Sequence, residues 1–357
     1  MNNFFAGDNG FHWFTGVVED RQDPLKTGRV RVRVIGAHTS DKTILPTADL
    51  PWASCMLAAT SPGISGIGQS PAFLLEGSWV FGYFRDGAKK QEPVVLGSMP
   101  GYPTETANTS KGFYDPNGVY PTSINEPDVN RLAVNNIEKE HSSLTARKAD
   151  RKTSIATADF DTDTAADGSI IAASDGGSFD QPTIPYSAIY PYNRVFESES
   201  GHILEFDDTS TKERIHLRHK VGTSIEMAGD HRTDIIKGEH YTLTTSNSNT
   251  LIEGNTNTSI NGHHKLYINK SGSSDNHYDI QIGPNANINI QVDNGDINLV
   301  TKSGKVNVNS GGDYNLKVGG NMTVNVAGSV SETVEGSKTS NTTGAVIHRG
   351  QTIDLNP

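Results

Sequence analysis

The residues of this chain that are best suited to hold a metal are three histidines in its C-terminal part. His263 and His264 are adjacent. Neighbours in a strand point to opposite faces, so at most one of the pair would face a site shared between chains. His348 lies alone in AVIHRGQTIDLNP, and a zinc site needs three or four ligands. We therefore expect surface histidines and no metal site.

Catalytic arrangements are equally incomplete. Glu138, Glu140 and Asp150 follow no spacing that would pair a general acid with a nucleophile, so we expect solvated charges. Gly66-Ile67-Gly68 and Gly311-Gly312 resemble phosphate-binding loops, but neither precedes a helical segment, and turns explain both. The order of residues indicates no serine–histidine or cysteine–histidine site, and no clustered aromatics interleaved with a basic patch. The prediction is no catalytic, cofactor-binding or metal site, and no enzyme.

Composition excludes several classes of protein. The formal net charge is −11 with no basic block, which argues against a nucleic-acid binder, because that binding depends on neutralised phosphates. Cys55 is the single cysteine, so no intrachain disulfide is expected, and assembly in the cytoplasm is favoured. The N-terminal MNNFFAGDNG lacks the pattern of a secretory signal. No run approaches the roughly 18 apolar residues of a membrane span.

The element that dominates the C-terminal part is an eight-residue repeat. Glycines recur every eighth residue, and valines precede three of them by two positions: Gly304, Gly312, Gly320, Gly328, Gly336 and Gly344, with Val318, Val326 and Val334. This octad predicts a short strand and a corner, where glycine suits because it takes φ > 0. Ile-x-Gly units ending at Gly238, Gly254 and Gly262 continue the repeat upstream. Two extra residues between Gly262 and Gly304 shift its phase.

This tract cannot form its own core. No Phe or Trp follows Phe206, and only Pro284 and Pro357 follow Pro191. Proline cannot donate to a strand ladder, so its scarcity favours long ladders. One or two apolar residues in each octad form too thin a stripe to be buried within one chain, so we expect several chains to share one core. Disorder is the alternative, but a disordered tract has no reason to keep this period.

The preceding part divides into two units. Residues 1–103 contain five strand-like runs, among them GRVRVRVIG and GSWVFGYFRD, which predicts a small barrel of the OB type. Residues 104–190 are rich in Ser, Thr, Asp, Ala and Pro, and predict an extended connector with one helix-compatible stretch at 128–150. Residues 191–357 open with YPYNRVFESESGHILEFDDT and continue as the octads.

These segments resemble, in order, the central spike protein family of T4-type contractile-tailed phages. DPLKTGRVRVRVIG, DLPWA, GSWVFGYFRDG and EPVVLGSMPG resemble its OB domain; GFYDPNGVYP and EPDVNRLA resemble its connector; and NRVFESESGHILEFDDT resembles the start of its needle. Related spikes occur in type VI secretion systems and contractile bacteriocins. The resemblance implies an all-β homotrimer with an N-terminal OB-fold barrel, an extended linker and a C-terminal intertwined triple-stranded β-helix. Short phage spikes bind a tip metal through His-x-His, whereas His348 here is followed by Arg349 and Gly350.

The resemblance also carries expectations about partners and activity. It implies a baseplate hub protein at the OB end, a PAAR-type tip protein at the C-terminus, and the outer membrane as mechanical target, in a virion assembled in the host cytoplasm. The T4-type protein has a lysozyme domain between barrel and needle, but residues 104–190 are about half as many as such a domain needs. We therefore predict a structural cell-puncturing spike without its own muramidase. The alternatives are a spike-associated peptidoglycan hydrolase and a trimeric receptor-binding or adhesin fibre.

Overall fold

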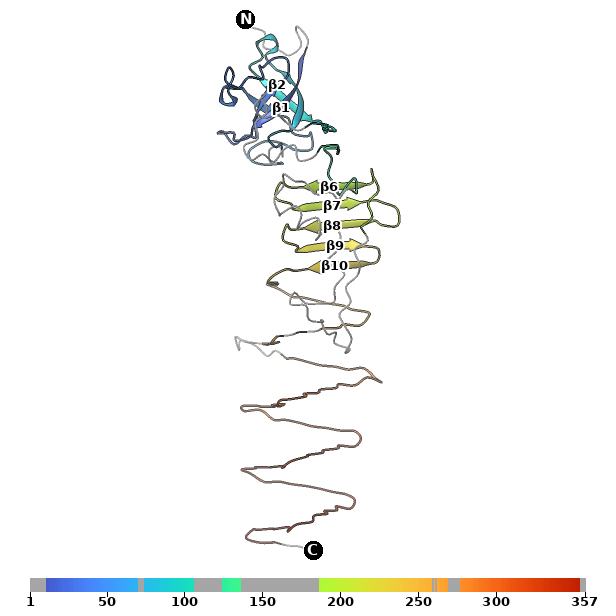
Figure 1. The fold of residues 1–357 in the computed structure, drawn as a ribbon. Helices are drawn as coiled ribbons and strands as arrows, with labels where there is room; N and C mark the ends of the chain where they lie inside the picture. The colour runs from blue at the N-terminus through green and yellow to red at the C-terminus, as the bar shows by residue number, and fades with distance from the viewer. Residues whose placement is uncertain are drawn as a thin grey trace. The chain divides into compact units, whose positions relative to one another are not determined.

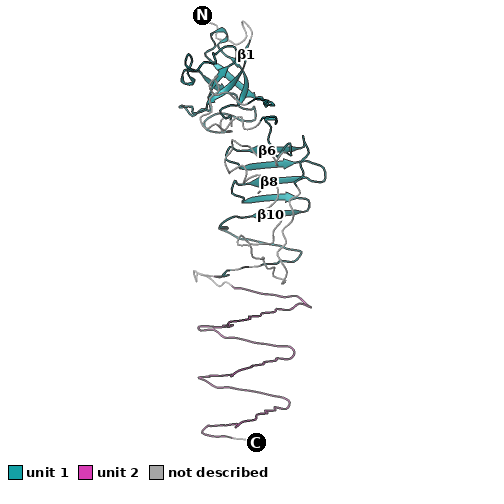
Figure 2. Cartoon of the chain, viewed as in Figure 1, with its two compact units in different colours: residues 1–265 teal, residues 266–357 magenta. Residues whose placement is uncertain are grey.

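The computed structural model describes residues 11–69, 74–105, 124–135, 186–258, 260, 262–268 and 277–353. The chain divides into two compact units, Met1–Lys265 and Leu266–Pro357 (Figure 2). The described residues contain strands and two short 3-10 turns but no α-helix, so the all-β prediction is confirmed. Within them, no helix has the length and apolar character of a membrane span. Most of the predicted connector, 104–190, lies outside the described residues, and its boundaries stay predictions.

The N-terminal strands close into a five-stranded barrel, which confirms the OB-type prediction (Figure 1). Its strand order is β1-β2-β3-β5-β4; β3 pairs with β5 in parallel, and the other pairs are antiparallel. The strands are β1 (His12–Asp20), β2 (Val30–Val34), β3 (Trp52–Cys55), β4 (Trp79–Phe84) and β5 (Pro93–Ser98). Short 3-10 turns, η1 (Thr47–Asp49) and η2 (Gly87–Lys89), precede β3 and β5.

Alternating residues of these strands fill the barrel. Val30, Val32 and Val34 of β2 are buried, as the alternation in GRVRVRVIG predicts. At Gly82 of β4 the backbone of β5 comes so close that an added Cβ would lie 2.1 Å from the Val94 carbonyl oxygen. A tight apolar interior therefore determines which residues of each strand point outward.

Residues 193–235 form a second sheet, built from consecutive antiparallel strands (Figure 1). The order is β10-β9-β8-β7-β6, so every strand pairs with its neighbour in sequence. The strands are β6 (Asn193–Glu197), β7 (Ile203–Asp207), β8 (Arg214–Arg218), β9 (Ser224–Ala228) and β10 (His231–Ile235). The motif predicted to begin the needle thus forms a sheet within a single chain.

After Ile235 the described residues contain no helix and no strand paired within the chain. Extended segments alternate with bends (Figure 1), and a bend falls at each of the six octad glycines, so the predicted corners are confirmed. The expected reason for glycine there is wrong, because none of the six has a positive φ. An added Cβ would also meet open space, apart from Thr301 Cβ at 4.0 Å from Gly304. The chain's own atoms therefore leave room for a side chain at these corners.

Candidate functional surfaces

The residues considered above as metal ligands or catalytic groups do not lie together in the described part of the chain. His263, His264 and His348 are exposed, and no group of three or more His, Cys, Asp or Glu among the described residues is placed to hold a metal. Glu138, Glu140 and Asp150 lie outside the described residues. Burial raises the pKa of Cys55 to about 11, so this thiol stays protonated and is a poor nucleophile at neutral pH.

The two glycine motifs lie in turns. Gly66 and Gly68 have positive φ angles of 77° and 120°. Gly66 lies in a turn closed by an isolated bridge between Ile64 and Ile67, and Gly68 forms a bend directly after it. The backbone amide of Gln69 donates to Ser61 Oγ across this turn, at 2.9 Å. Gly311 and Gly312 form an octad bend. Neither arrangement presents a helix N-terminus to a phosphate group.

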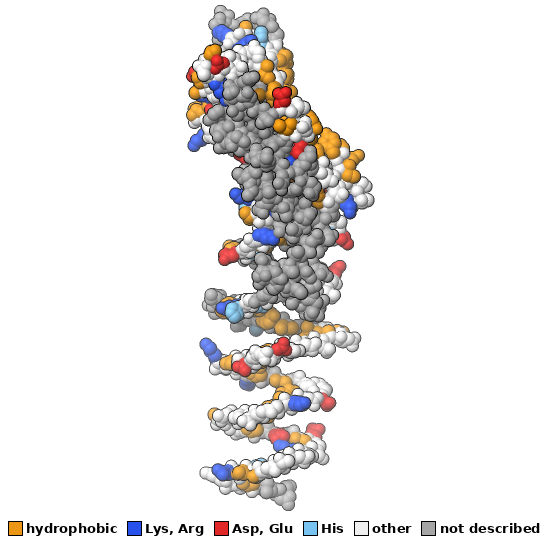
Figure 3. All heavy atoms as spheres, viewed as in Figure 1, with side chains coloured by type: hydrophobic (Ala, Val, Ile, Leu, Met, Phe, Trp, Pro, Cys, Tyr) orange, Lys and Arg blue, Asp and Glu red, His pale blue; other side chains and the backbone are white. Residues whose placement is uncertain are grey.

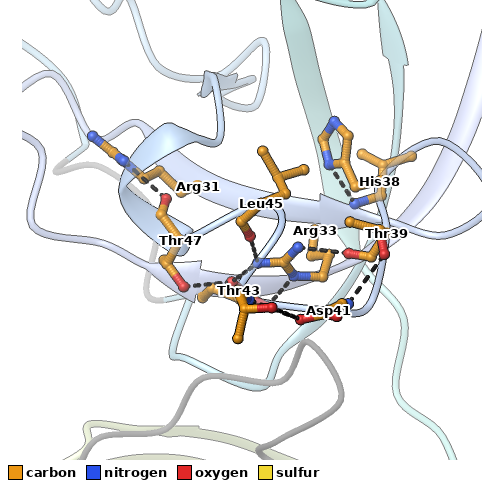
Figure 4. Close-up of polar contacts among 10 residues, drawn as sticks. Arg31, Arg33, His38, Thr39, Asp41, Thr43, Leu45 and Thr47 are labelled. Atoms are coloured by element: carbon orange, nitrogen blue, oxygen red, sulfur yellow. Dashed lines mark hydrogen bonds and ion pairs between the residues drawn. The ribbon is translucent and has the colours of Figure 1, made fainter.

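A cluster of polar contacts in the barrel holds a loop in place (Figure 4). Arg33 of β2 donates to both carboxylate oxygens of Glu19 on β1, from Nε at 2.6 Å and from Nη2 at 3.0 Å. Arg33 also donates to the carbonyl oxygens of Thr39 and Leu45, and Thr47 Oγ1 donates to Glu19. Because each charge is buried and bonded, the cluster holds the 39–47 loop against the barrel and leaves no free base.

His38 directly precedes this loop. Its Nδ1 accepts a hydrogen bond from the Val34 amide at 3.0 Å. Burial lowers the pKa of His38, and the charge of Arg33 lowers it further. His38 is therefore a neutral structural acceptor, and no carboxylate–histidine pair forms here.

An exposed aromatic cluster covers the outer face of β1 and β4, which the sequence analysis did not predict. Trp13 stacks between Phe11 and Phe81, with ring centroids 5.0 and 5.3 Å away. Tyr83 meets Phe11 and Trp13 edge to face, with centroids at 5.4 and 5.9 Å. Trp13 is 53% exposed. We call these four residues the aromatic face. The signal was the alternation of aromatic residues in both strands, but only the pairing of β1 with β4 joins them.

The second sheet has an exposed apolar face. Its side chains form two rows across the strands, because Phe196 pairs with Leu204 and Leu204 with Leu217, while Phe206 pairs with Ile215 and Ile215 with Met227. The sheet's apolar face is therefore Phe196, Leu204, Phe206, Ile215, Leu217 and Met227, which are 38–67% exposed. An apolar surface of this size on a folded chain indicates a binding partner.

The opposite face of this sheet is buried and charged. Glu205, His216 and Glu226 are paired across β7, β8 and β9. Arg214 lies 2.5 Å from Glu205 and 3.1 Å from Glu226, and Asn193 Nδ2 donates to Glu205 at 2.7 Å. Burial alone raises the pKa of Glu205, but hydrogen bonds from His216 and Asn193 and the charge of Arg214 hold that pKa below its usual value. Glu205 is thus an ionised partner of Arg214.

A described piece of the connector lies on this buried face. Leu132 packs against Ile203, and its carbonyl oxygen accepts hydrogen bonds from Tyr186 Oη at 2.9 Å and from Asn193 Nδ2 at 3.2 Å. Asn130 Nδ2 donates to Glu197 at 2.6 Å. Described residues of the connector thus lie on the charged face, whereas the six side chains of the sheet's apolar face are exposed.

The octad tract exposes its apolar residues as well (Figure 3). Val318, Val326 and Val334 are 46%, 47% and 47% exposed. Because the described residues here have no strand partner within the chain, both the side chains and the backbone groups are available to other chains.

Comparison with known proteins shows which family shares these parts. The sequence model of the Gp5 N-terminal OB domain matches residues 36–174, and that of the Gp5 C-terminal repeat matches in three copies within residues 311–341. Protein Gp5 of Vibrio phage KVP40 is 37% identical over 278 residues, which cover 70% of this chain and 63% of that protein. The pre-baseplate central spike protein Gp5 of Enterobacteria phage T4 is 46% identical over 121 residues, which cover 32% of this chain and 21% of that protein. The matches span less than two thirds of either relative.

Proposed function

Because this chain carries the OB domain and the C-terminal repeat of the Gp5 central-spike family, we propose that three copies of it form the structural spike of a contractile tail baseplate. The spike belongs to the virion. Its needle concentrates the force of sheath contraction on the host outer membrane, and its work is mechanical.

The observation that carries this proposal is the exposed apolar face of the second sheet. Fully burying an apolar side chain of this size stabilises by about 1.5–3 kcal/mol, and roughly half of each of the six is still exposed. Burying the rest would contribute about 6 kcal/mol per chain. Further copies of the chain fit this face, because the octads downstream expose apolar residues in the same way and require the same kind of neighbour.

A closed assembly also supplies the missing backbone partners. Strands from three chains, wound around one axis, pair with each other and leave no free edge along the shaft. A shaft without edges resists bending and does not aggregate through strand addition. Both properties suit a needle that must pierce a membrane.

Sedimentation velocity of the full chain tests the assembly. We expect a single species with three times the mass of the chain. In SDS gel electrophoresis we expect a slowly migrating band that is replaced by the monomer band after boiling. A compact monomer at micromolar concentration would contradict the proposal.

For the OB end we propose a baseplate hub protein as partner, bound through the aromatic face. Its four residues carry no charge, so they offer nothing to phosphates, whereas stacked aromatics are typical anchors of protein interfaces. We expect Trp13→Ala combined with Phe81→Ala to abolish co-purification with the hub protein of the same tail and to leave the trimer intact. Exposed Leu25 lies outside the aromatic face, so Leu25→Ala is the matched control and should still bind.

At the other end we propose a small tip protein of the PAAR type. Val346 and Ile347 are 57% and 67% exposed. Consecutive residues of an extended chain point to opposite sides, so both sides of the chain are apolar here. We propose no enzymatic activity, no metal at His348 and no nucleic-acid partner. A zymogram on purified cell walls tests the first of these, and a cleared band would favour the alternative of a peptidoglycan hydrolase.

A further inference from the structure

The octads between residues 305 and 335 have one apolar and one polar side. Their large apolar side chains all have even numbers: Val306, Val308, Tyr314, Leu316, Val318, Met322, Val324, Val326, Val330 and Val334. The odd positions from 305 to 335 are Asn, Thr, Ser, Lys, Asp, Glu, Gly and one Ala. Because successive side chains of an extended chain point to opposite sides, even-numbered residues share one side. An octad is an even number of residues, so each corner preserves this assignment.

Glu332 and Lys338 are charged residues on the apolar side. Both are even-numbered, like Val330 and Val334. Beyond Val334 the even positions are Gly336, Lys338, Ser340, Thr342 and Gly344, and no apolar residue occupies one until Val346. Apolar packing therefore cannot align the chains between Val334 and Val346.

The structure joins these two charges across a corner. Lys338 Nζ forms an ion pair with Glu332 Oε2, and the chain bends between them at Glu335 and Gly336. Six extended residues span about 20 Å, which exceeds the combined reach of the two side chains. They meet because both lie on the concave side of the bend. In a chain that winds around a common axis, the concave side of a corner faces that axis.

We infer that Glu332 and Lys338 point into the interior shared by the assembled chains, where they form a layer of ion pairs that fixes the register of the three strands. This inference rests on the proposed trimer. A buried ion pair adds little net stability, but a charge left without its partner in an interior is strongly destabilising. A chain shifted by one octad would place Lys338 opposite apolar or hydroxyl side chains, and that register is therefore rejected.

The alternative is a solvated pair on the outer surface. Such a pair contributes little and is screened by salt. In the isolated chain the side chains of Glu332 and Lys338 are 56% and 62% exposed. Only measurements on the assembled chains can therefore distinguish an interior pair from a surface pair.

The test compares variants of the full chain by thermal unfolding and by sedimentation velocity. Lys338→Met removes the cation and leaves Glu332 unpaired; the exchange Glu332→Lys with Lys338→Glu restores a pair in reverse order. Glu335→Gln is the matched control, since Glu335 lies at the same corner but at an odd position. We expect Lys338→Met to lower the unfolding midpoint of the trimer by about 5 °C or more, the exchange to recover most of that loss, and Glu335→Gln to leave the midpoint unchanged.

The salt dependence of the unfolding midpoint distinguishes an interior ion pair from a surface ion pair. If the layer is interior, the loss in Lys338→Met persists in 1 M NaCl (roughly a 3 Å screening length). Equal midpoints for Lys338→Met and Glu335→Gln, or a difference that vanishes in salt, would overturn the inference while a trimeric wild type upholds the proposed function. A monomeric wild type would overturn the proposed function itself, and the inference with it.

Discussion

Substitution of Ile215 by aspartate should abolish assembly without unfolding the second sheet. Ile215 lies on the central strand β8, between Phe206 and Met227 on the sheet's apolar face, and is 41% exposed. In the isolated chain a carboxylate at this position still reaches water. In the proposed trimer the same carboxylate from each of three chains would be enclosed.

The exposed fraction of Ile215 determines how much free energy of assembly the substitution removes. About two fifths of the 1.5–3 kcal/mol for burying an isoleucine remains to be gained on assembly, which is about 1 kcal/mol per chain and about 3 kcal/mol per trimer. Ile215→Thr, which keeps the β-branched shape, should therefore weaken assembly by about two orders of magnitude. Ile215→Asp adds several kcal/mol for each enclosed carboxylate, enough to prevent assembly at micromolar concentration.

Sedimentation velocity at several protein concentrations measures the effect, and circular dichroism reports the strand content. Lys212→Asp, in the loop between β7 and β8, changes the charge more strongly but lies outside the sheet's apolar face, and it should sediment as the wild type does. If Ile215→Asp also sedimented as a stable trimer, the apolar face would not be an interface between copies, and the assembly argument would fail.

Three further predictions concern the barrel. Gly82→Ala should unfold it or lower its melting temperature severely, because the new Cβ would lie 2.1 Å from the Val94 carbonyl oxygen; near-UV circular dichroism on heating checks this. Glu19→Gln should cost about 3–5 kcal/mol, because it leaves the buried Arg33 without its counter-charge, and chemical denaturation measures the change. Cys55, with its pKa raised to about 11, should react slowly with iodoacetamide at pH 8 and much faster in urea, as followed by mass spectrometry; equal rates would contradict its burial.

The sequence predicted the barrel because its strands follow the usual rule of apolar residues inside. In β2 the valines alternate with arginines, and the valines are buried. The same rule could not locate the aromatic face. In β1 and β4, buried Phe14 and Phe84 stand next to outward-facing aromatic residues, and no feature of either strand alone separates the two groups.

The second sheet has the opposite arrangement, with apolar residues exposed and charged residues buried. In β7, Leu204 and Phe206 are exposed, while Glu205 and Asp207 are buried. Alternation reveals two sides but does not say which side the chain covers. Here the answer depends on Leu132, about 70 residues earlier in the sequence, whose packing against Ile203 covers the charged side. Long-range contacts of this kind leave no local pattern in the sequence from which they could be predicted.

In the proposed trimer, folding and association of the octad tract would be one process, for a physical reason. Ordering a residue costs about 1–2 kcal/mol of backbone entropy, and after Ile235 the described residues gain no strand pairing within the chain in return. The second sheet differs, since β6 to β10 pair within one chain and already present an apolar face. Association can therefore begin at that sheet, before any octad is ordered. In this proposed assembly the octads gain their partners as the three chains meet. A change at Ile215, about 90 residues before Gly304 in the sequence, should therefore affect the whole needle.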